Sequence, residues 1–219
     1  MKAYTSNNIR NIAVLGHGGK GKTTLCEAML YIAGASDRLG RVADGNTVLD
    51  FDSEEKRRKS SVSSAIAALE WDNTKLNIID APGLFDFEGG AAEAVRAAEA
   101  VLIVTSAGSG VDVGTEKAFR AAEKKGAAKF FAVTKTDSDH RNFYKTFDAL
   151  KEVYGNKLCP TIIPYMEGNI TKCYVNLMTG MAFSYDENGK ATKVPVPEDS
   201  VIEEMTSAFM EAVATTDDA

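Results

Sequence analysis

The chain has 219 residues, of which 44% are hydrophobic and 26% are charged, so it suits one globular α/β domain or such a domain with an insertion. A formal net charge of −6 excludes electrostatic binding of nucleic acid by the chain as a whole, and we expect no direct sequence-specific contact with it. Three cysteines without paired spacing indicate reduced thiols, and no apolar run resembles a signal peptide or a membrane span. These features predict a cytoplasmic protein without membrane contacts, which we expect to be a monomer.

Residues 16–24, GHGGKGKTT, fit the phosphate-loop pattern G-x-x-x-x-G-K-[ST]. Residues 12–15 before them read as a buried strand, and residues 22–32 have the apolar spacing of a helix. Glycines allow successive backbone N–H groups to surround phosphates at a helix N-terminus. The candidate nucleotide-binding residues are therefore Gly16, His17, Gly18, Gly19, Lys20, Gly21, Lys22, Thr23 and Thr24. The alternative is a glycine-rich turn that binds nothing, but the complete motif between a strand and a helix favours a nucleotide site.

Two side chains of this motif carry chemistry of their own. The Lys22 ammonium can reach the β- and γ-phosphates, which makes it a candidate catalytic residue. The Thr23 hydroxyl can ligate a Mg²⁺ ion that keeps most of its waters.

The next segment, residues 36–61, shows no sustained hydrophobic period. We expect residues 36–52 to form a long mobile loop. Residues 53–61, SEEKRRKSS, are charged and then rich in hydroxyls. Their basic half could contact the phosphates of a partner nucleic acid, but a solvated face is the commoner role of so short a run.

Residues 62–71 and 75–80 are predicted to form a two-stranded hairpin that ends in the tetrapeptide D-A-P-G. Downstream of a phosphate loop, such an Asp commonly holds the Mg²⁺ shell through water, and the Gly amide can bond the γ-phosphate. We therefore assign Asp80 to metal and nucleotide binding, and Gly83 to nucleotide binding and catalysis. D-A-P-G alone is a common turn, and its place at the end of a strand after the phosphate loop gives it this meaning.

Alternating segments follow. Helices are expected at 91–100, 114–125 and 142–154, and strands at 101–105, 129–133 and 161–164. This alternation predicts an α/β protein with the P-loop NTPase fold, in which a mostly parallel sheet carries helices on both faces. After residue 164 we expect a small α+β insertion, with antiparallel strands at 171–177 and 181–185. A helix at 200–213 should follow, with Ser200 as N-cap and Glu203 as its capping-box partner.

Residues 134–137, TKTD, indicate guanine rather than adenine. A carboxylate at Asp137 can accept two parallel N–H bonds from guanine, a pair that adenine does not offer. Lys135 would lie with its aliphatic stem along the base, and Thr134 keeps only a hydroxyl where the usual motif has Asn. A polar turn is the alternative for this tetrapeptide alone, but its order after the other two motifs favours a base site.

In this order, G-H-x-x-x-G-K-T-T-L, D-x-P-G and [NT]-K-x-D resemble the nucleotide-binding domain of translational GTPases, most of all that of elongation factor G and its paralogues. Residues 60–65 are similar to the first switch of that family, with Arg58 on the switch Arg and Ser61 on the Thr that ligates Mg²⁺. Residues 175–177, 185–186 and 194–199 resemble an insertion within the family's domain. The resemblance implies GTP and GDP as ligands, Mg²⁺ held by Thr23, Ser61 and Asp80, and the ribosome as partner of the full-length protein.

Four positions depart from the family pattern. Gly19 stands where the family usually has Asp, Ser61 replaces the first-switch Thr, and Lys59–Ser60 replaces a Gly-Ile pair. Leu84 follows D-A-P-G where the family has a His that positions the attacking water, and leucine has no polar atom with which to orient water.

A family Ser-Ala motif that closes the guanine pocket comes after the insertion, whereas Ser106–Ala107 here precedes the TKTD motif. We therefore expect residues 1–219 to be a GTP-binding domain, with a core over about 1–164 and part of the insertion over about 165–219. Further C-terminal domains are expected beyond Ala219.

The leading functional hypothesis is a GTP-binding and GTP-hydrolysing domain of an elongation factor G-like protein that acts on the ribosome. The alternative is a guanine-nucleotide-sensing switch that hydrolyses poorly because of Leu84. An ATP-using P-loop protein is a third possibility, against which Asp137 argues. Translocation, ribosome protection and ribosome recycling are all compatible with the first hypothesis.

Overall fold

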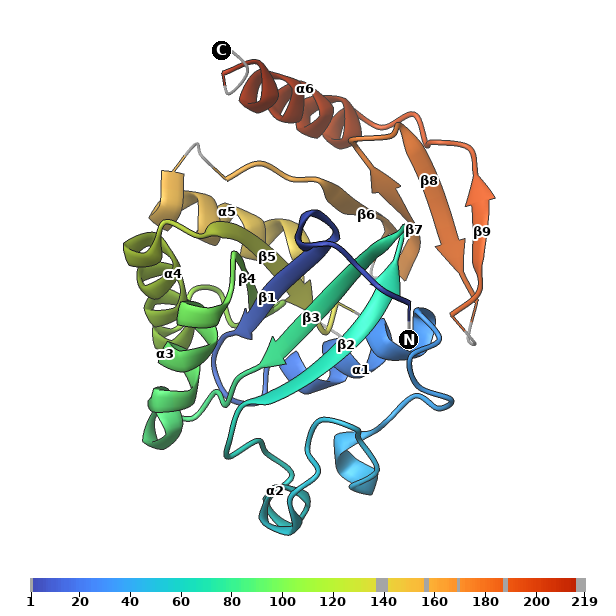
Figure 1. The fold of residues 1–219 in the computed structure, drawn as a ribbon. Helices are drawn as coiled ribbons and strands as arrows, with labels where there is room; N and C mark the ends of the chain where they lie inside the picture. The colour runs from blue at the N-terminus through green and yellow to red at the C-terminus, as the bar shows by residue number, and fades with distance from the viewer. Residues whose placement is uncertain (1, 137–141, 156–157, 169, 187–188, 216–219) are drawn as a thin grey trace. The chain divides into compact units, whose positions relative to one another are not determined.

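The computed structural model describes residues 2–136, 142–155, 158–168, 170–186 and 189–215 (Figure 1). The chain divides into two compact units, Met1–Thr134 and Lys135–Ala219. The first unit holds a five-stranded sheet and the second a four-stranded sheet. Among the described residues, no helix is both long and apolar enough to cross a membrane.

The sheet of the first unit has the strand order β2-β3-β1-β4-β5. Its strands are β1 (Ile9–Leu15), β2 (Ala65–Trp71), β3 (Thr74–Asp80), β4 (Ala100–Ser106) and β5 (Ala128–Thr134). Four of them run parallel, and β2 is antiparallel to β3. Asp72 and Asn73 join β2 to β3 with positive φ angles of 43° and 59°, the sign that a two-residue hairpin turn requires. The predicted hairpin and mostly parallel sheet are confirmed.

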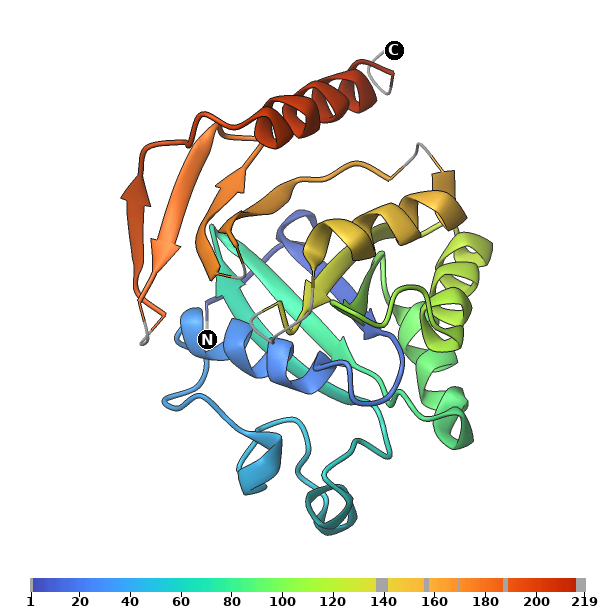
Figure 2. The same cartoon turned by 180° about the vertical axis from the view of Figure 1, so that it is seen from behind.

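Helices cover both faces of this sheet, because successive residues of a strand point to opposite sides. Ala13 and Leu15 of β1 share one core cluster with residues of α3 (Glu88–Ala97) and α4 (Val113–Lys125), whereas Val14 lies in a second cluster with residues of α1 (Lys22–Ile32). Figure 2 shows α1 in front of the sheet. The predicted α/β layering is therefore confirmed.

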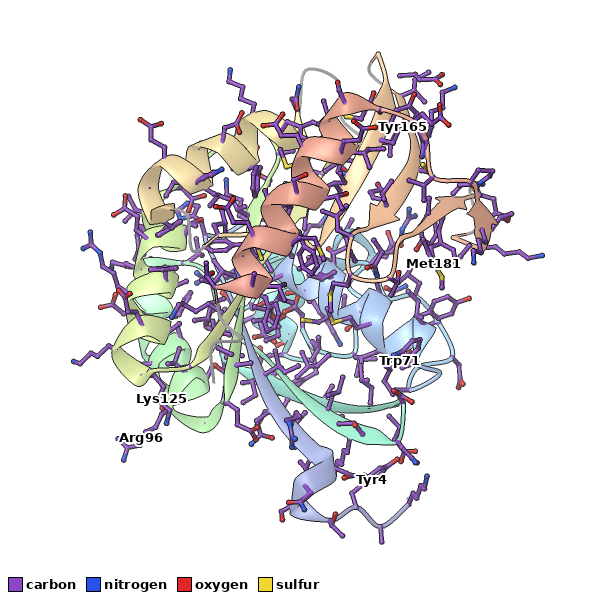
Figure 3. All side chains as sticks on the ribbon, turned by 90° about the horizontal axis from the view of Figure 1, so that it is seen from above. Tyr4, Trp71, Arg96, Lys125, Tyr165 and Met181 are labelled. Atoms are coloured by element: carbon purple, nitrogen blue, oxygen red, sulfur yellow. The ribbon has the colours of Figure 1, made fainter. Side chains whose placement is uncertain are left out.

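A hydrogen bond links the helices α3 and α4 near their C-terminal ends. The Lys125 ammonium on α4 donates a hydrogen bond of 3.1 Å to the carbonyl oxygen of Arg96 on α3, and Figure 3 shows these two side chains next to each other. Lysine near a helix C-terminus is favourable because it meets carbonyl groups that have no partner within the helix.

Residues 36–52 form a loop, as predicted, apart from one short 3-10 helix, but the end of this loop is packed into the core rather than mobile. Leu49 is 2% exposed and belongs to the core cluster of α1, and Thr47 and Asp50 are also buried. The segment contains a short 3-10 helix, η2 (Val42–Asp44), and leads into α2 (Ser53–Arg58). The charged run after residue 52 is thus a helix, whose N-cap Asp52 forms a capping box with Glu55.

The second unit is an antiparallel sheet with two helices. Its elements are α5 (Phe143–Tyr154), β6 (Ile162–Glu167), β7 (Ile170–Asn176), β8 (Met181–Tyr185), β9 (Ala191–Val194) and α6 (Ser200–Ala214). The strand order is β6-β7-β8-β9, which confirms the expected antiparallel strands. Ile163, Val175 and Ile202 lie in its core.

Two expectations for the second unit are wrong. Residues 161–164 were expected in the parallel sheet, but β6 pairs with β7 as an edge strand. Pro164 suits an edge because it has no N–H to donate to a second neighbouring strand. The N-cap of α6 is Asp199, which accepts a hydrogen bond of 2.8 Å from Val201 N, and Ser200 is the first helical residue. Asp satisfies the same cap requirement one position earlier.

Candidate nucleotide-binding site

The predicted phosphate loop connects β1 to α1, and its backbone conformation favours glycine at three positions. Gly16, Gly19 and Gly21 have φ angles of 138°, 73° and 91°, values that side chains rarely allow. A Cβ atom on Gly16 would also lie 2.2 Å from the carbonyl oxygen of Val104 on β4. The glycines therefore set the shape of the loop and allow it to lie close to the sheet.

Lys22 folds back over this loop and is 6% exposed. Its ammonium donates to the carbonyl oxygens of Gly16 and His17, each at 3.1 Å. Burial lowers its pKa, and the carboxylate of Asp80 acts in the opposite direction. A Cβ atom on Gly83 would lie 2.2 Å from the Lys22 nitrogen, so the structure brings together the two predicted catalytic residues.

A cluster of hydroxyls and carboxylates lies at the start of α1. Thr23 Oγ1 donates to Asp80 Oδ2 at 2.6 Å, and Ser61 Oγ donates to Asp50 Oδ1 at 2.7 Å. The two hydroxyl oxygens are 3.2 Å apart. The structure therefore brings together the three predicted metal ligands and adds Asp50, which sequence reasoning missed because an isolated acid in a loop has no local signal.

The atoms of this cluster suit Mg²⁺, which prefers oxygen ligands. The Thr23 and Ser61 hydroxyls hydrogen-bond to Asp80 and Asp50 and lie within hydrogen-bond distance of each other, so four oxygen-bearing side chains meet at one point. Asp80 Oδ1 and Asp50 Oδ2 are buried and have no hydrogen-bond partner in the part of the chain that the structure describes. Burial raises the pKa of Asp80 to about 7, with Asp50 adding to the rise, and burial also raises the pKa of Asp50. A cation would relieve this accumulation of unpaired oxygen atoms.

The described residues contain no group of three or more His, Cys, Asp or Glu side chains that could hold a metal ion. Any ion here would thus depend on two hydroxyls as well as two carboxylates. Thr24 follows Thr23 on α1, but its side chain is exposed.

The predicted guanine motif begins with a contact to the phosphate loop. Thr134 Oγ1 lies 2.7 Å from the Lys20 carbonyl oxygen and 3.1 Å from that of Thr105, and it can donate to both. Lys135, the first residue of the second unit, has a φ of 57°. Asp137 lies outside the described residues. The role of Thr134 in the structure is therefore to fasten the loop.

The phosphate loop also lies against the N-terminus of α4, which sequence reasoning missed. The Lys20 ammonium is 3.1 Å from Asp112 Oδ2, and these side chains are only 15% and 19% exposed. Asp112 is the N-cap of α4 and accepts from Thr115 N at 2.8 Å. Burial acts to raise the pKa of Asp112, but the hydrogen bonds from Thr115 and the Lys20 ammonium outweigh it and lower the pKa. A Cβ atom on Gly114 would collide with His17, so the loop and α4 are closely fitted.

The residues after D-A-P-G also contact the loop. A Cβ atom on Gly18 would be 3.0 Å from Leu84 Cδ2, and the Phe85 ring meets the His17 ring edge to face with centroids 5.4 Å apart. The Lys117 ammonium lies 4.5 Å from the Phe85 ring centroid. Leu84 thus places an apolar side chain beside the loop at the position where the resemblance leads one to expect histidine.

Comparison with known proteins agrees with this geometry. The family described as the elongation factor Tu GTP-binding domain matches residues 7–216. A protein named elongation factor G-like protein from Mycobacterium tuberculosis is 34% identical over 206 residues, which cover 94% of this chain and 28% of that protein. Elongation factor G from Mycoplasma genitalium is 30% identical over 215 residues, covering 96% of this chain and 31% of the relative.

A crystal structure of a protein from Thermus thermophilus has a TM-score of 0.90 and 35% sequence identity to this chain. It covers 96% of this chain, which in turn covers 32% of the solved chain. The chain thus spans about a third or less of the relatives it matches. Since the family match extends over nearly all of its residues, the chain belongs to the elongation factor Tu GTP-binding domain family, with an elongation factor G-like sequence.

Proposed function

We propose that this chain binds GTP and GDP together with Mg²⁺ and hydrolyses GTP, as the nucleotide-binding domain of an elongation factor G-like protein that acts on the ribosome in the cytoplasm. The observation that carries the proposal is the convergence of Thr23, Ser61, Asp80 and Asp50 beside the phosphate loop. These residues come from α1, the segments before α2 and β2 and the end of β3, and a shared cation would use the two carboxylate oxygens that have no hydrogen-bond partner among the described residues.

The protein's own contribution to hydrolysis would be positioning and electrostatics, which dominate phosphoryl transfer. Lys22 and the loop N–H groups would neutralise charge on the β- and γ-phosphates, and the Gly83 amide would bond the γ-phosphate. Thr23 and Ser61 would ligate Mg²⁺ directly, with Asp80 and Asp50 accepting from its waters. The bound ion supplies further neutralisation of phosphate charge.

Guanine selectivity in this proposal comes from Asp137, with Lys135 along the base. The test is titration of the purified chain with fluorescent GDP and ADP at fixed Mg²⁺. We expect clear preference for GDP, and equal affinities would contradict the guanine assignment. Asp137→Asn should shift the preference towards xanthine nucleotides, since it replaces an acceptor with a donor opposite the base.

A second candidate function is a guanine-nucleotide-sensing switch with impaired hydrolysis. Leu84 favours it, because this apolar side chain lies against Gly18 and cannot orient a water molecule. In this proposal the nucleotide would still control the segments around Ser61 and Gly83, since both lie at the phosphate loop. Single-turnover hydrolysis by the longer protein with ribosomes separates the two functions.

We also propose that the GTP-binding domain has its core over about 1–164 and part of a family insertion over about 165–219. The relatives' greater length supports the presence of further domains in the functional protein.

A further inference from the structure

Two glutamates of the first unit are almost completely buried, and neither forms an ion pair with a basic side chain among the described residues. Glu27 on α1 is 0% exposed, and Glu55 on α2 is 1% exposed. The described hydrogen bonds of both carboxylates go to residues between 47 and 63. Burying a carboxylate is costly unless it is well hydrogen-bonded, so this arrangement needs a reason.

Glu27 holds the beginning of this segment. Its Oε1 accepts from Val48 N at 2.8 Å and from Leu49 N at 3.0 Å. Thr23 and Glu27 are four residues apart on α1 and so share one face of the helix. The face that presents the Thr23 hydroxyl therefore also holds the backbone just before Asp50.

Glu55 holds the other end. Its Oε1 accepts from Val62 N at 2.9 Å and Ser63 N at 3.1 Å, and its Oε2 accepts from Asp52 N at 3.3 Å. This carboxylate thus spans the chain on both sides of Ser61. Bonds between a carboxylate and backbone N–H groups are charge-assisted and stronger than neutral ones.

Gly40 completes the contact with Glu27. A Cβ atom on Gly40 would lie 2.1 Å from Glu27 Oε2 and 2.8 Å from the Cα atom of Thr47. No side chain fits between these groups, so the carboxylate is enclosed by the backbone of the segment it holds.

We infer that Glu27 and Glu55 are positioning residues, which together hold Asp50 and Ser61 against Thr23 so that the Mg²⁺ and γ-phosphate site is complete. The inference deepens the proposed function and rests on it. Asp50 follows the bonds of Glu27 by one residue, and Ser61 precedes those of Glu55 by one residue. Their own bond of 2.7 Å then links the two held ends beside Thr23.

The test compares the wild-type chain with Glu27→Ala, Glu27→Gln and Gly40→Ala. Binding of a fluorescent non-hydrolysable GTP analogue and of fluorescent GDP is measured as Mg²⁺ is varied. Glu27→Ala should raise the Mg²⁺ concentration for half-maximal binding of the GTP analogue by about tenfold or more, because it removes two charge-assisted bonds. Gly40→Ala should act in the same direction, and Glu27→Gln should restore most of the binding because its amide oxygen still accepts.

A matched control is Glu54→Ala. Glu54 precedes Glu55 on α2, but within the described part of the chain its carboxylate bonds to Arg57 and Arg58 of the same helix and to no residue of the cluster around Thr23, so we expect unchanged Mg²⁺ dependence. Circular dichroism melting of each variant separates positioning from stability, since a purely structural glutamate lowers the melting temperature without changing the GTP-to-GDP affinity ratio. If Glu27→Ala does not fold, Gly40→Ala and Glu55→Gln provide the same test.

Trypsin adds a measurement that needs no nucleotide. Lys56, Arg57 and Arg58 lie between the two held ends, and Glu27→Ala should be cut there faster than the wild type by about fivefold or more. The inference is overturned, and the proposed function is not, if the folded variants bind guanine nucleotides as tightly as the wild type does, with the same GTP-to-GDP affinity ratio and the same Mg²⁺ dependence. A wild-type chain that binds no guanine nucleotide would overturn the proposed function, and the inference with it.

Discussion

Thr134 at the end of β5 donates its hydroxyl to the carbonyl oxygen of Lys20 in the phosphate loop over 2.7 Å. The resemblance to translational GTPases leads one to expect Asn at this position. The shorter threonine side chain is therefore sufficient to reach the loop, and the same oxygen also lies 3.1 Å from the Thr105 carbonyl on β4. The first residue of the TKTD motif thus fixes the position of the loop for which we propose phosphate binding.

Replacing Thr134 with Val should weaken binding of GDP and GTP equally, by about threefold to tenfold. The substitution keeps the shape but removes a hydrogen bond, a loss of roughly 0.5–1.5 kcal/mol. The preference for guanine over adenine should not change, because the Thr134 hydroxyl is bonded to the backbone carbonyls of Lys20 and Thr105. Fluorescent titration measures both effects, with Thr134→Ser as the control that keeps the hydroxyl. Loss of base selectivity in Thr134→Val would show that this residue acts on the base instead.

Gly83→Ala should weaken binding of a GTP analogue by about tenfold and that of GDP less. The new Cβ atom would lie 2.2 Å from Lys22 Nζ and 2.8 Å from Gly18 N. The Lys22 side chain would have to move away, and the backbone at Gly18 leaves little room for a shift. A substitution at this point therefore disturbs the place proposed for the γ-phosphate. Gly89→Ala is the matched control, because no atom of the described residues lies within 4 Å of its added Cβ. Equal losses for both nucleotides would contradict a specific role at the γ-phosphate.

Asp80 should make folding stability depend on pH when Mg²⁺ is removed. Its pKa is about 7 in the folded chain because of burial, against about 3.9 for an unfolded Asp. The folded state then holds a proton that the unfolded state has released, so stability falls as the pH rises from about 4 through about 7. Melting temperatures in EDTA should decline more steeply with pH for the wild type than for Asp80→Asn. Addition of Mg²⁺ at about pH 8 should raise the melting temperature of the wild type but not that of Asp80→Asn. If the melting temperatures of the two proteins change with pH in the same way, Asp80 is not protonated in the folded chain.

Local patterns explain what could be predicted from the sequence. The phosphate loop, the hairpin around Asp72–Asn73 and the alternation of helices with strands each depend on neighbouring residues, and all of them have the expected secondary structure. The three predicted metal ligands also meet: Thr23 and Asp80 do so because the phosphate loop and the end of β3 lie at one edge of the sheet, and the segment before β2 brings Ser61 to them.

The features that were missed depend on distant side chains. Val48 and Leu49 are held by Glu27, more than 20 positions earlier, and because this anchor is not local, the polar composition of the loop did not indicate that its end is buried. Asp50 and the pairing of Lys20 with Asp112 likewise join segments that no short window contains. The strand at Pro164 was assigned to the wrong sheet because its apolar sequence suits either one, and only its partner strand decides.

Hydrolysis should be limited by Leu84. The Leu84 side chain lies against Gly18, and the family resemblance leads one to expect a water-positioning His in place of Leu84. Gly19 stands where the family usually has an Asp, so the loop also lacks that carboxylate. Because positioning and electrostatics supply most of the catalysis, we expect the isolated chain to turn over GTP at about 10⁻⁴ per second or more slowly, like unstimulated switch GTPases. Leu84→His in the longer protein should raise turnover on ribosomes, whose phosphates could hold the imidazole over the water. Single-turnover assays of both forms, with and without ribosomes, measure this. Rapid ribosome-stimulated hydrolysis by the wild type would show instead that Leu84 is an apolar gate and that another group orients the water.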